Sequence, residues 1–558
     1  MKNKSQTLGR GFALLSISNI LTKLLSLFFI PIVRKMLGGA SEYALFSGTN
    51  EVFAFIYVLA TAGLPVAIAK LVSELVAKRD EKGAERAFKL ARAVMFSIGV
   101  VLTVLMAALA KPIAAAMNLE ESWAGILFIA PTIVICSLLS AYKGYFQGRK
   151  NMKPTAISQV TEQLIHMVVS IVMIWIMSPL GIIWAVAGAS TGTVVGALVS
   201  LVFMVVQRKK TLASDRAQKE SDGPLPSDGE ALDKVMAREP RTRERGLTTG
   251  QLIKKIFYYS IPITLNTAIQ YGGNMVDASI LLRRMEAGGL AQQVARGLYG
   301  DLASTRQLLN VPTSIISAMC VSILPTLAAL HALGQNREKS LKANEGYKLC
   351  YMIAVPMTVG FAVFAQAVFT LLGYGDNYDL LMALSFSVIL QGTVHLQSSI
   401  LQSINKLFTS TMFMLSGVVC KIMLSYTLAA IPALNVYGAV ISTYVSFLVP
   451  FLLNQWALNK RGKMGLSVVR NLWRPCLASI FMVVVGFPAY AGLHALLNRM
   501  LPTRTYITTL VAFAIAVVIC VVVYFFVLMK IGGVTKEDVS EISPAIARRW
   551  PKKLKRIL

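Results

Sequence analysis

Apolar runs of roughly twenty or more residues recur along almost the whole chain, and they limit its possible folds more than any other feature. A run of that length can cross the hydrocarbon core of a bilayer as one α-helix. Of the 558 residues, 55% are hydrophobic and only 15% are charged, whereas soluble domains carry about a quarter charged residues. The sequence therefore predicts an all-α integral membrane protein that crosses the bilayer many times.

The runs predict about fourteen transmembrane helices, an even number that places both termini on one side. Most of the 55 Lys and Arg residues fall on that side, and positively charged loops face the cytoplasm. We therefore expect a multi-pass protein of the cell membrane with both termini cytoplasmic. The expected spans are roughly 11–36, 45–70, 91–116, 124–146, 155–177, 181–206, 252–282, 303–332, 347–372, 380–403, 408–430, 436–458, 473–497 and 505–530.

The net charge of +28 does not indicate a nucleic-acid partner, because the basic residues lie in loops between spans and form no stripe with interleaved aromatics. The six cysteines are scattered singly, so the sequence predicts neither a metal site nor a disulfide framework. No phosphate-binding loop occurs, and the acidic stretch at 373–379 has no large loop or soluble domain to support catalysis. We expect a protein that is not an enzyme.

Three stretches recur in the same order about 250 residues later and indicate an internal repeat. The pairs are "IVRKMLGG" at 32–39 with "LLRRMEAGG" at 281–289, "GLPVAIAKLVSELVAKRDEKG" at 63–83 with "ILPTLAALHALGQNREKS" at 323–340, and "YFQGRKNM" at 145–152 with "ILQSINKL" at 400–407. Parallel six-helix repeats place a substrate cavity at the lobe interface and work by rocking one lobe against the other. The expected divisions are an N-lobe at 1–206, a basic, mostly disordered cytoplasmic linker at 207–250, a C-lobe at 251–460, two further helices at 461–530 and a basic cytoplasmic tail at 531–558.

Polar residues inside the expected spans are the candidate transport path, because a charge at mid-bilayer costs about 2.5–3.5 kcal/mol unless it meets water or a partner. Gln159, Glu162 and His166 share one face of the fifth span. The alternatives are a hydrated helix end for Gln159 and Glu162, and snorkelling for Lys23 in the first span. The full set of expected cavity residues is Asn19, Lys23, Glu51, Gln159, Glu162, His166, Asn274, Asp277, Arg306, Asn310 and Lys421.

Two questions about these residues stay open in the sequence. Glu51, Glu162 and Asp277 either bind a coupling Na⁺ or H⁺, or pair with Lys23 and neighbouring cations. The repeat aligns Gln147 with Gln402, and the same offset carries His166 onto Lys421 (166 + 255 = 421). These two side chains either face one cavity and hold one phosphate together, or are satisfied separately, each within its own lobe.

The stretch "YFQGRKNMKPTAISQVTEQ" at 145–163, the six-plus-six-plus-two layout and the basic linker together resemble the polysaccharide-export branch of the MOP superfamily. More narrowly, they are similar to the stage V sporulation protein B and YtgP type, which is related to the MurJ lipid II flippases. Lys23, in "LTKLLSL", lies where those flippases carry a basic cavity residue, whereas Phe28 and Phe29 stand near the place of a further arginine of the family.

The resemblance implies a V-shaped, MATE-like transporter that flips an undecaprenyl-pyrophosphate-linked saccharide, foremost lipid II of peptidoglycan and cell-wall biosynthesis, to the outer leaflet. The same superfamily contains cation-coupled multidrug exporters, which are the alternative function. The expected partners are the sugar lipid and membrane lipids. We expect a monomer without a cofactor, coupled to Na⁺, H⁺ or the membrane potential.

Overall fold

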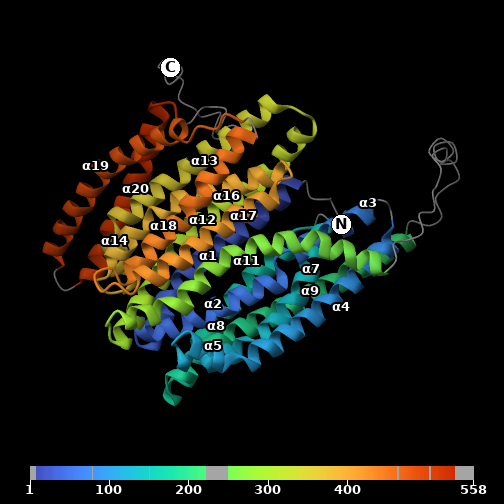
Figure 1. Ribbon diagram of the computed structural model, residues 1–558, viewed down its shortest axis with the longest axis horizontal. Coiled ribbons are helices and arrows are strands. Elements are labelled where there is room, and N and C mark those ends of the chain that lie inside the picture. Colours follow the sequence, from blue (N-terminus) through green and yellow to red (C-terminus); the bar gives the residue numbers. More distant parts are fainter. Residues whose placement is uncertain are drawn as a thin grey trace. The chain divides into compact units, whose positions relative to one another are not determined.

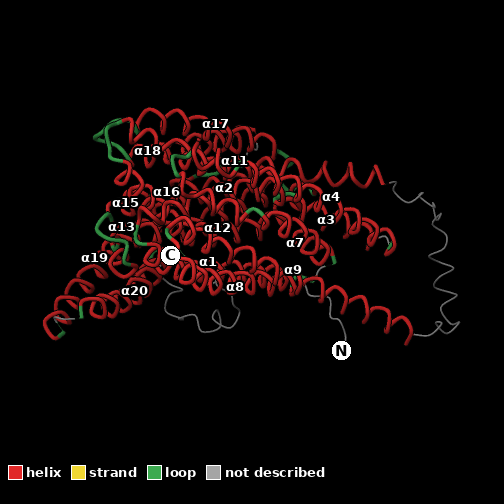
Figure 2. Tube along the Cα trace, turned by 90° about the horizontal axis from the view of Figure 1, so that it is seen from below, coloured by secondary structure: helices red, strands yellow, loops and turns green. Residues whose placement is uncertain are grey.

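The computed structural model of the chain describes residues 8–77, 80–149, 151–221, 249–461, 464–501 and 504–533. Within these ranges the regular structure is helical and contains no strand (Figure 2). Eleven helical segments there are long and apolar enough to cross a membrane. The prediction of an all-α, multi-pass membrane protein is therefore confirmed.

The expected count of fourteen spans stays a prediction. The eleven segments match expected spans. The three remaining expected spans, at 11–36, 252–282 and 303–332, correspond to the long helices α1, α11 and α12.

Two compact units divide the chain, one of residues 1–29 and 45–275 and the other of residues 30–44 and 276–558. The boundaries between the units fall inside helices α1, α2 and α11, whereas the repeat predicts a boundary in the linker at 207–250. Figure 1 labels the helices along the chain. Those that lie wholly or partly in the first unit are α1 Leu8–Leu37, α2 Ala40–Thr61, α3 Leu64–Ala77, α4 Glu81–Ala108, α5 Ala110–Ala116, α6 Trp123–Ile129, α7 Pro131–Gly148, α8 Lys153–Met177, α9 Ile182–Ser221 and α11 Thr249–Ala287.

The second unit also holds the C-terminal helix pair, in which α19 and α20 run side by side (Figure 1). This pair packs against α13 and α14, and Phe364, Met482 and Tyr524 lie in the shared core. The helices of this unit after α11 are α12 Gln292–Ala332, α13 Asn336–Val363, α14 Ala365–Leu372, α15 Tyr378–Ser385, α16 Ser387–Ser403, α17 Leu407–Leu428, α18 Val436–Trp456, α19 Val468–Met500 and α20 Thr505–Lys530.

Helix α9 continues to Ser221, so the first part of the predicted linker is helical. The residues after Gln207 are mostly Lys, Arg, Ala, Gln and Glu, which have favourable helix propensities. The rest of the expected linker, 222–248, and the tail beyond 533 lie outside the described residues.

Three glycines at four-residue spacing, Gly188, Gly192 and Gly196, bring α9 against α8 inside the first unit. A Cβ on Gly192 would lie 2.5 Å from the carbonyl oxygen of His166, and one on Gly196 would lie 2.6 Å from that of Glu162. Small residues at this spacing let two membrane helices approach backbone to backbone. We call these three residues the glycine ridge; it fixes the height and rotation of α8, the helix that carries most of the expected polar face.

Candidate functional site

The polar face of α8 lies within the first unit and contacts α1. The Ser18 hydroxyl donates to the carbonyl oxygen of Ala156 at 2.8 Å and to Oε1 of Gln159 at 3.3 Å. Pro154 occupies the first turn of α8, where a missing N–H costs nothing, so this residue suits the start of the helix. Gln159, Glu162 and His166 are all half-buried.

Glu162 has one cationic partner among the described residues, Lys143 on α7, whose Nζ lies 3.4 Å from its Oε2. The Glu162 side chain is 28% exposed and that of Lys143 is 14% exposed. The contact is longer than a typical charge-assisted hydrogen bond of about 2.7–2.9 Å, and the carboxylate is partly accessible. The Glu162 carboxylate is therefore free to exchange partners at small cost.

His166 packs its ring edge-on against Phe29 of α1, with ring centroids 4.9 Å apart. Its Nε2 is buried and has no hydrogen-bond partner among the residues that the structure describes. A buried polar nitrogen without a partner costs about 1–3 kcal/mol, and a native protein usually keeps such a group for a reason.

Lys23 and Asn19 lie on α1 with exposed side chains. No ion pair involves Lys23 within the part of the chain that the structure describes. Two further expected residues of this unit, Glu51 on α2 and Asn274 on α11, are half-buried. The sequence had offered Lys23 as a partner for the acidic residues, whereas the carboxylate of Glu162 pairs with Lys143 instead.

The second unit assembles a buried ionic cluster around Asp277 of α11, which is 0% exposed. Lys421 of α17 places its Nζ 2.8 Å from Oδ2 of Asp277, and Arg306 of α12 bonds to the same oxygen. The Ser425 hydroxyl donates to Oδ1 at 3.2 Å. Two cations thus contact one carboxylate.

This arrangement connects three expected site residues, Asp277, Arg306 and Lys421, in one unit. Asn310, one turn beyond Arg306 on α12, donates instead to Oε1 of Gln307 at 3.1 Å. Lys421 pairs with Asp277 within its own unit. The joint action of His166 and Lys421 on one phosphate stays a prediction.

Sequence reasoning missed a second buried ion pair in this unit, between Arg34 at the end of α1 and Asp301 of α12, 2.6 Å apart. Arg34 also donates to the carbonyl oxygen of Tyr374 at 2.7 Å and to the Ser304 hydroxyl at 3.1 Å. Its guanidinium lies 4.8 Å from the Tyr374 ring centre. Burial raises the pKa of the Tyr374 phenol, so Arg34 faces a neutral ring. Each of these contacts joins residues that are distant in sequence, so no local motif predicts them.

The two units differ in how readily their polar groups can bind a ligand. The first holds an exposed lysine, a weakly paired carboxylate and an unsatisfied imidazole on apolar helices, all of which are able to meet a mobile ligand. The second holds a buried carboxylate that already pairs with two cations, Arg306 and Lys421. Cations in apolar helices suit an anionic ligand such as a phosphate.

Solved structures with this arrangement of helices are transporters. A structure described as the lipid II flippase MurJ in an inward closed conformation matches with a TM-score of 0.63 and 13% identity, and the match covers 96% of this chain and 99% of that one. An inward-facing multidrug resistance MATE family transporter of the MOP superfamily matches with a TM-score of 0.62 and 16% identity, over 81% of this chain and 99% of that one. The chain therefore has the fold of the MOP-superfamily transporters.

The family model described as polysaccharide biosynthesis protein matches residues 8–331, and the chain belongs to this family. Two curated relatives from Bacillus subtilis (strain 168) agree with it. Stage V sporulation protein B is 24% identical over 86% of this chain and 88% of its own. The lipid II flippase MurJ is 23% identical over 80% of this chain and 82% of its own. The resemblance seen in the sequence is thereby confirmed.

Proposed function

We propose that the chain flips an anionic, lipid-linked saccharide, foremost the undecaprenyl-pyrophosphate-linked peptidoglycan precursor lipid II, from the inner to the outer leaflet by alternating access. The observation that carries the proposal is Lys23, an exposed cation within an apolar helix and without an ion-pair partner among the described residues. A pyrophosphate is a ligand that would offset the cost of such a charge. The similarity to MurJ of Bacillus subtilis supports the same substrate class.

The proposed path runs along the α1 and α8 polar faces of the first unit, from Asn19 and Lys23 to Gln159 and His166. A diphosphate needs donors along its whole route, because charged oxygens without hydrogen bonds are costly in a low-dielectric region. The isoprenoid tail stays in the bilayer, so the protein has to accommodate only the head group. We propose Glu162 as the site at which a proton or Na⁺ couples to movement, because its carboxylate is weakly paired.

A multidrug exporter is the competing function, and the match to a MATE family transporter supports it. Organic cations are the drugs that an acidic cavity would attract, whereas the unpaired charge here is positive. The charge of Lys23 therefore separates the two functions in an experiment.

The test measures flipping of a fluorescent lipid II analogue in proteoliposomes with the full-length protein. Lys23→Ala should reduce the rate about tenfold or more, since a charge-assisted hydrogen bond is worth about 1.5–3 kcal/mol, and Lys23→Arg should keep most of it. Lys111→Ala, which removes a cation of α5 that lies over the Trp123 ring of α6, is the matched control. Full flipping by Lys23→Ala, or no flipping by the wild type together with export of an organic cation, would refute the proposal.

We also propose that the protein resides in the cell membrane as a monomer with both termini and the 207–250 linker in the cytoplasm. The bias of Lys and Arg toward one side supports this orientation. A single cysteine placed in that segment of a cysteine-free variant should react with an impermeant maleimide only after permeabilisation. Labelling in intact cells would show that this segment lies outside the cell and would refute the proposed orientation.

A further inference from the structure

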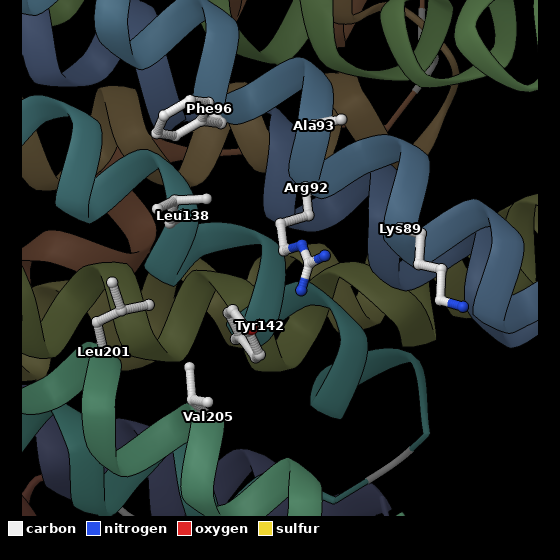
Figure 3. Close-up of a pocket in the computed structure, with 8 residues that line it drawn as sticks. All are labelled: Lys89, Arg92, Ala93, Phe96, Leu138, Tyr142, Leu201 and Val205. Atoms are coloured by element: carbon white, nitrogen blue, oxygen red, sulfur yellow. The ribbon is translucent and has the colours of Figure 1, made fainter.

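A pocket of about 390 Å³ lies in the first unit between α4, α7 and α9, apart from the polar faces of α1 and α8. Figure 3 shows α4 contributing Lys89, Arg92 and Phe96, while α7 contributes Leu138 and Tyr142. Leu201 and Val205 of α9 line the opposite wall. Its volume lies within the range of small-molecule sites, and its lining combines two cations with an apolar floor.

The charges at the pocket are not balanced by nearby carboxylates. Glu85 accepts two hydrogen bonds from Arg208 at 2.5 and 2.6 Å, so little of its charge remains for Lys89, whose Nζ lies 3.9 Å away. Within the described residues no carboxylate pairs with Arg92, which has only the Phe88 ring at 5.9 Å as an electrostatic neighbour. Figure 3 shows the Arg92 side chain extending from α4 toward Tyr142. The pocket therefore has an excess of positive charge.

The face of α4 that carries Arg92 is charged up to this residue and apolar beyond it. Arg92 is the last charged residue of α4, and the following side chains on its face are Phe96, Val100 and Val104 at helical spacing. These three are 50%, 37% and 61% exposed, so their face has no protein partner and is available to hydrocarbon. Helix α4 therefore presents two cations followed by an exposed apolar face, which matches the charged head group and the acyl chain of a lipid.

We propose that this pocket binds the phosphate of an anionic glycerophospholipid of the membrane, with an acyl chain lying along Phe96, Val100 and Val104. Lys89 and Arg92 donate to the phosphate, since ammonium and guanidinium groups form strong charge-assisted bonds with phosphate oxygens. Zwitterionic lipids carry their own cation beside the phosphate and gain less from two further positive charges. The lipid is a bound component of the first unit and is distinct from the transported sugar lipid.

The first arm of the test counts bound lipids on the purified full-length protein by native mass spectrometry, with phosphatidylglycerol and phosphatidylcholine as probes. The double variant Lys89→Gln, Arg92→Gln should bind phosphatidylglycerol about tenfold more weakly, because each juxtamembrane cation contributes about a few-fold in affinity for anionic lipid. Lys82→Gln with Arg86→Gln is the matched control, with the same charge loss on the same helix outside the pocket. Equal losses in both double variants, or equal binding of both lipids by the wild type, would overturn the proposal.

The second arm separates a lipid from free phosphate and keeps both cations. Ala93 lines the pocket with an exposed side chain, so Ala93→Trp should fill the pocket without disturbing the core. We expect this variant to lose phosphatidylglycerol binding, and we expect millimolar inorganic phosphate not to displace the lipid from the wild type. Unchanged binding by Ala93→Trp would show that the groove is not the site. Displacement by phosphate would show an anion site that does not recognise lipid.

Discussion

Each unit of the protein has an acidic residue in its membrane helices that pairs with a lysine, but the two carboxylates are held in different ways. Asp277 in the second unit is fully buried and contacts Lys421, Arg306 and Ser425. Glu162 in the first unit is part-exposed and contacts one lysine at 3.4 Å. An acidic residue that must release and regain a proton or cation needs an accessible and weakly paired carboxylate, so the first unit is suited to exchange and the second to fixed structure.

The sequence left open whether the acidic residues bind a coupling ion or pair with neighbouring cations, and the two carboxylates differ in this respect. For Asp277, two cations already occupy the positions that a coupling ion would need, and a third would have to displace one of them. For Glu162, the loss of one weak contact is enough. We therefore expect substitutions at the two sites to differ mainly in their effect on stability, and the following changes test that difference.

The largest effect is expected for Asp277→Asn, which removes the carboxylate charge that pairs with both Arg306 and Lys421. Breaking a buried ion pair by removing one partner costs about 3–5 kcal/mol. The free energy of unfolding, or the melting temperature in detergent, should fall accordingly, and adding Lys421→Met should recover part of the loss. A fall no larger than that of Glu162→Gln would erase the contrast between the two units.

An intermediate effect is expected for Gly196→Ala, because the new methyl group would meet the Glu162 carbonyl oxygen at 2.6 Å. Overpacking of this kind costs about 1–3 kcal/mol and would displace α8 at the Glu162 position. Thermal stability and flipping should decrease together. Gly360→Ala on α13 is the control, since no atom lies within 4 Å of its added Cβ, and it should be neutral or slightly stabilising. Similar melting temperatures for both variants would remove the role assigned to the glycine ridge.

A smaller effect of opposite sign is expected for His166→Phe. The substitution removes a buried nitrogen that has no hydrogen-bond partner and keeps a ring against Phe29, so stability should rise by about 1 kcal/mol. Flipping of the lipid analogue should nevertheless fall if the imidazole meets the substrate. A destabilised but fully active variant would show that His166 is a structural residue.

The smallest effect on stability is expected for Glu162→Gln and for Lys143→Gln. Their contact is long and part-exposed, so each change should cost less than about 1 kcal/mol. Coupling should show itself instead in transport, as loss of the dependence on a proton or Na⁺ gradient in Glu162→Gln proteoliposomes. An unchanged gradient dependence would exclude Glu162 as the coupling residue.

The secondary structure was predictable because hydrophobic run length and turn residues are local properties. The expected span at 155–177 and helix α8 at Lys153–Met177 differ by two residues at the start and none at the end. The polar face of this helix, with Gln159, Glu162 and His166, was likewise predictable from the sequence. The partners of the polar residues were not, because they depend on which helices pack together.

Asp277 illustrates this limit: the sequence named it as a site residue but did not identify its partners, which are 29 residues away for Arg306 and much farther for Lys421. The Arg34–Asp301 pair spans 267 residues, and the sequence treated the Arg34 region only as part of a repeat. One overlooked signal was present, however. Gly188, Gly192 and Gly196 repeat at the spacing that brings membrane helices into backbone contact.

The glycine ridge has a kinematic consequence for transport. Helix α8 touches α9 through main-chain atoms at three successive turns, and hydroxyl bonds from Ser170 to Ala189 and from Ser200 to Ser158 cross the same seam. Because the two backbones are in direct contact, no flexible side chains lie between them that could rearrange and let one helix slide or rotate against the other. The backbone positions of Glu162 and His166 are therefore tied to α9, so a movement of α8 that changes the environment of these residues has to carry α8 and α9 together.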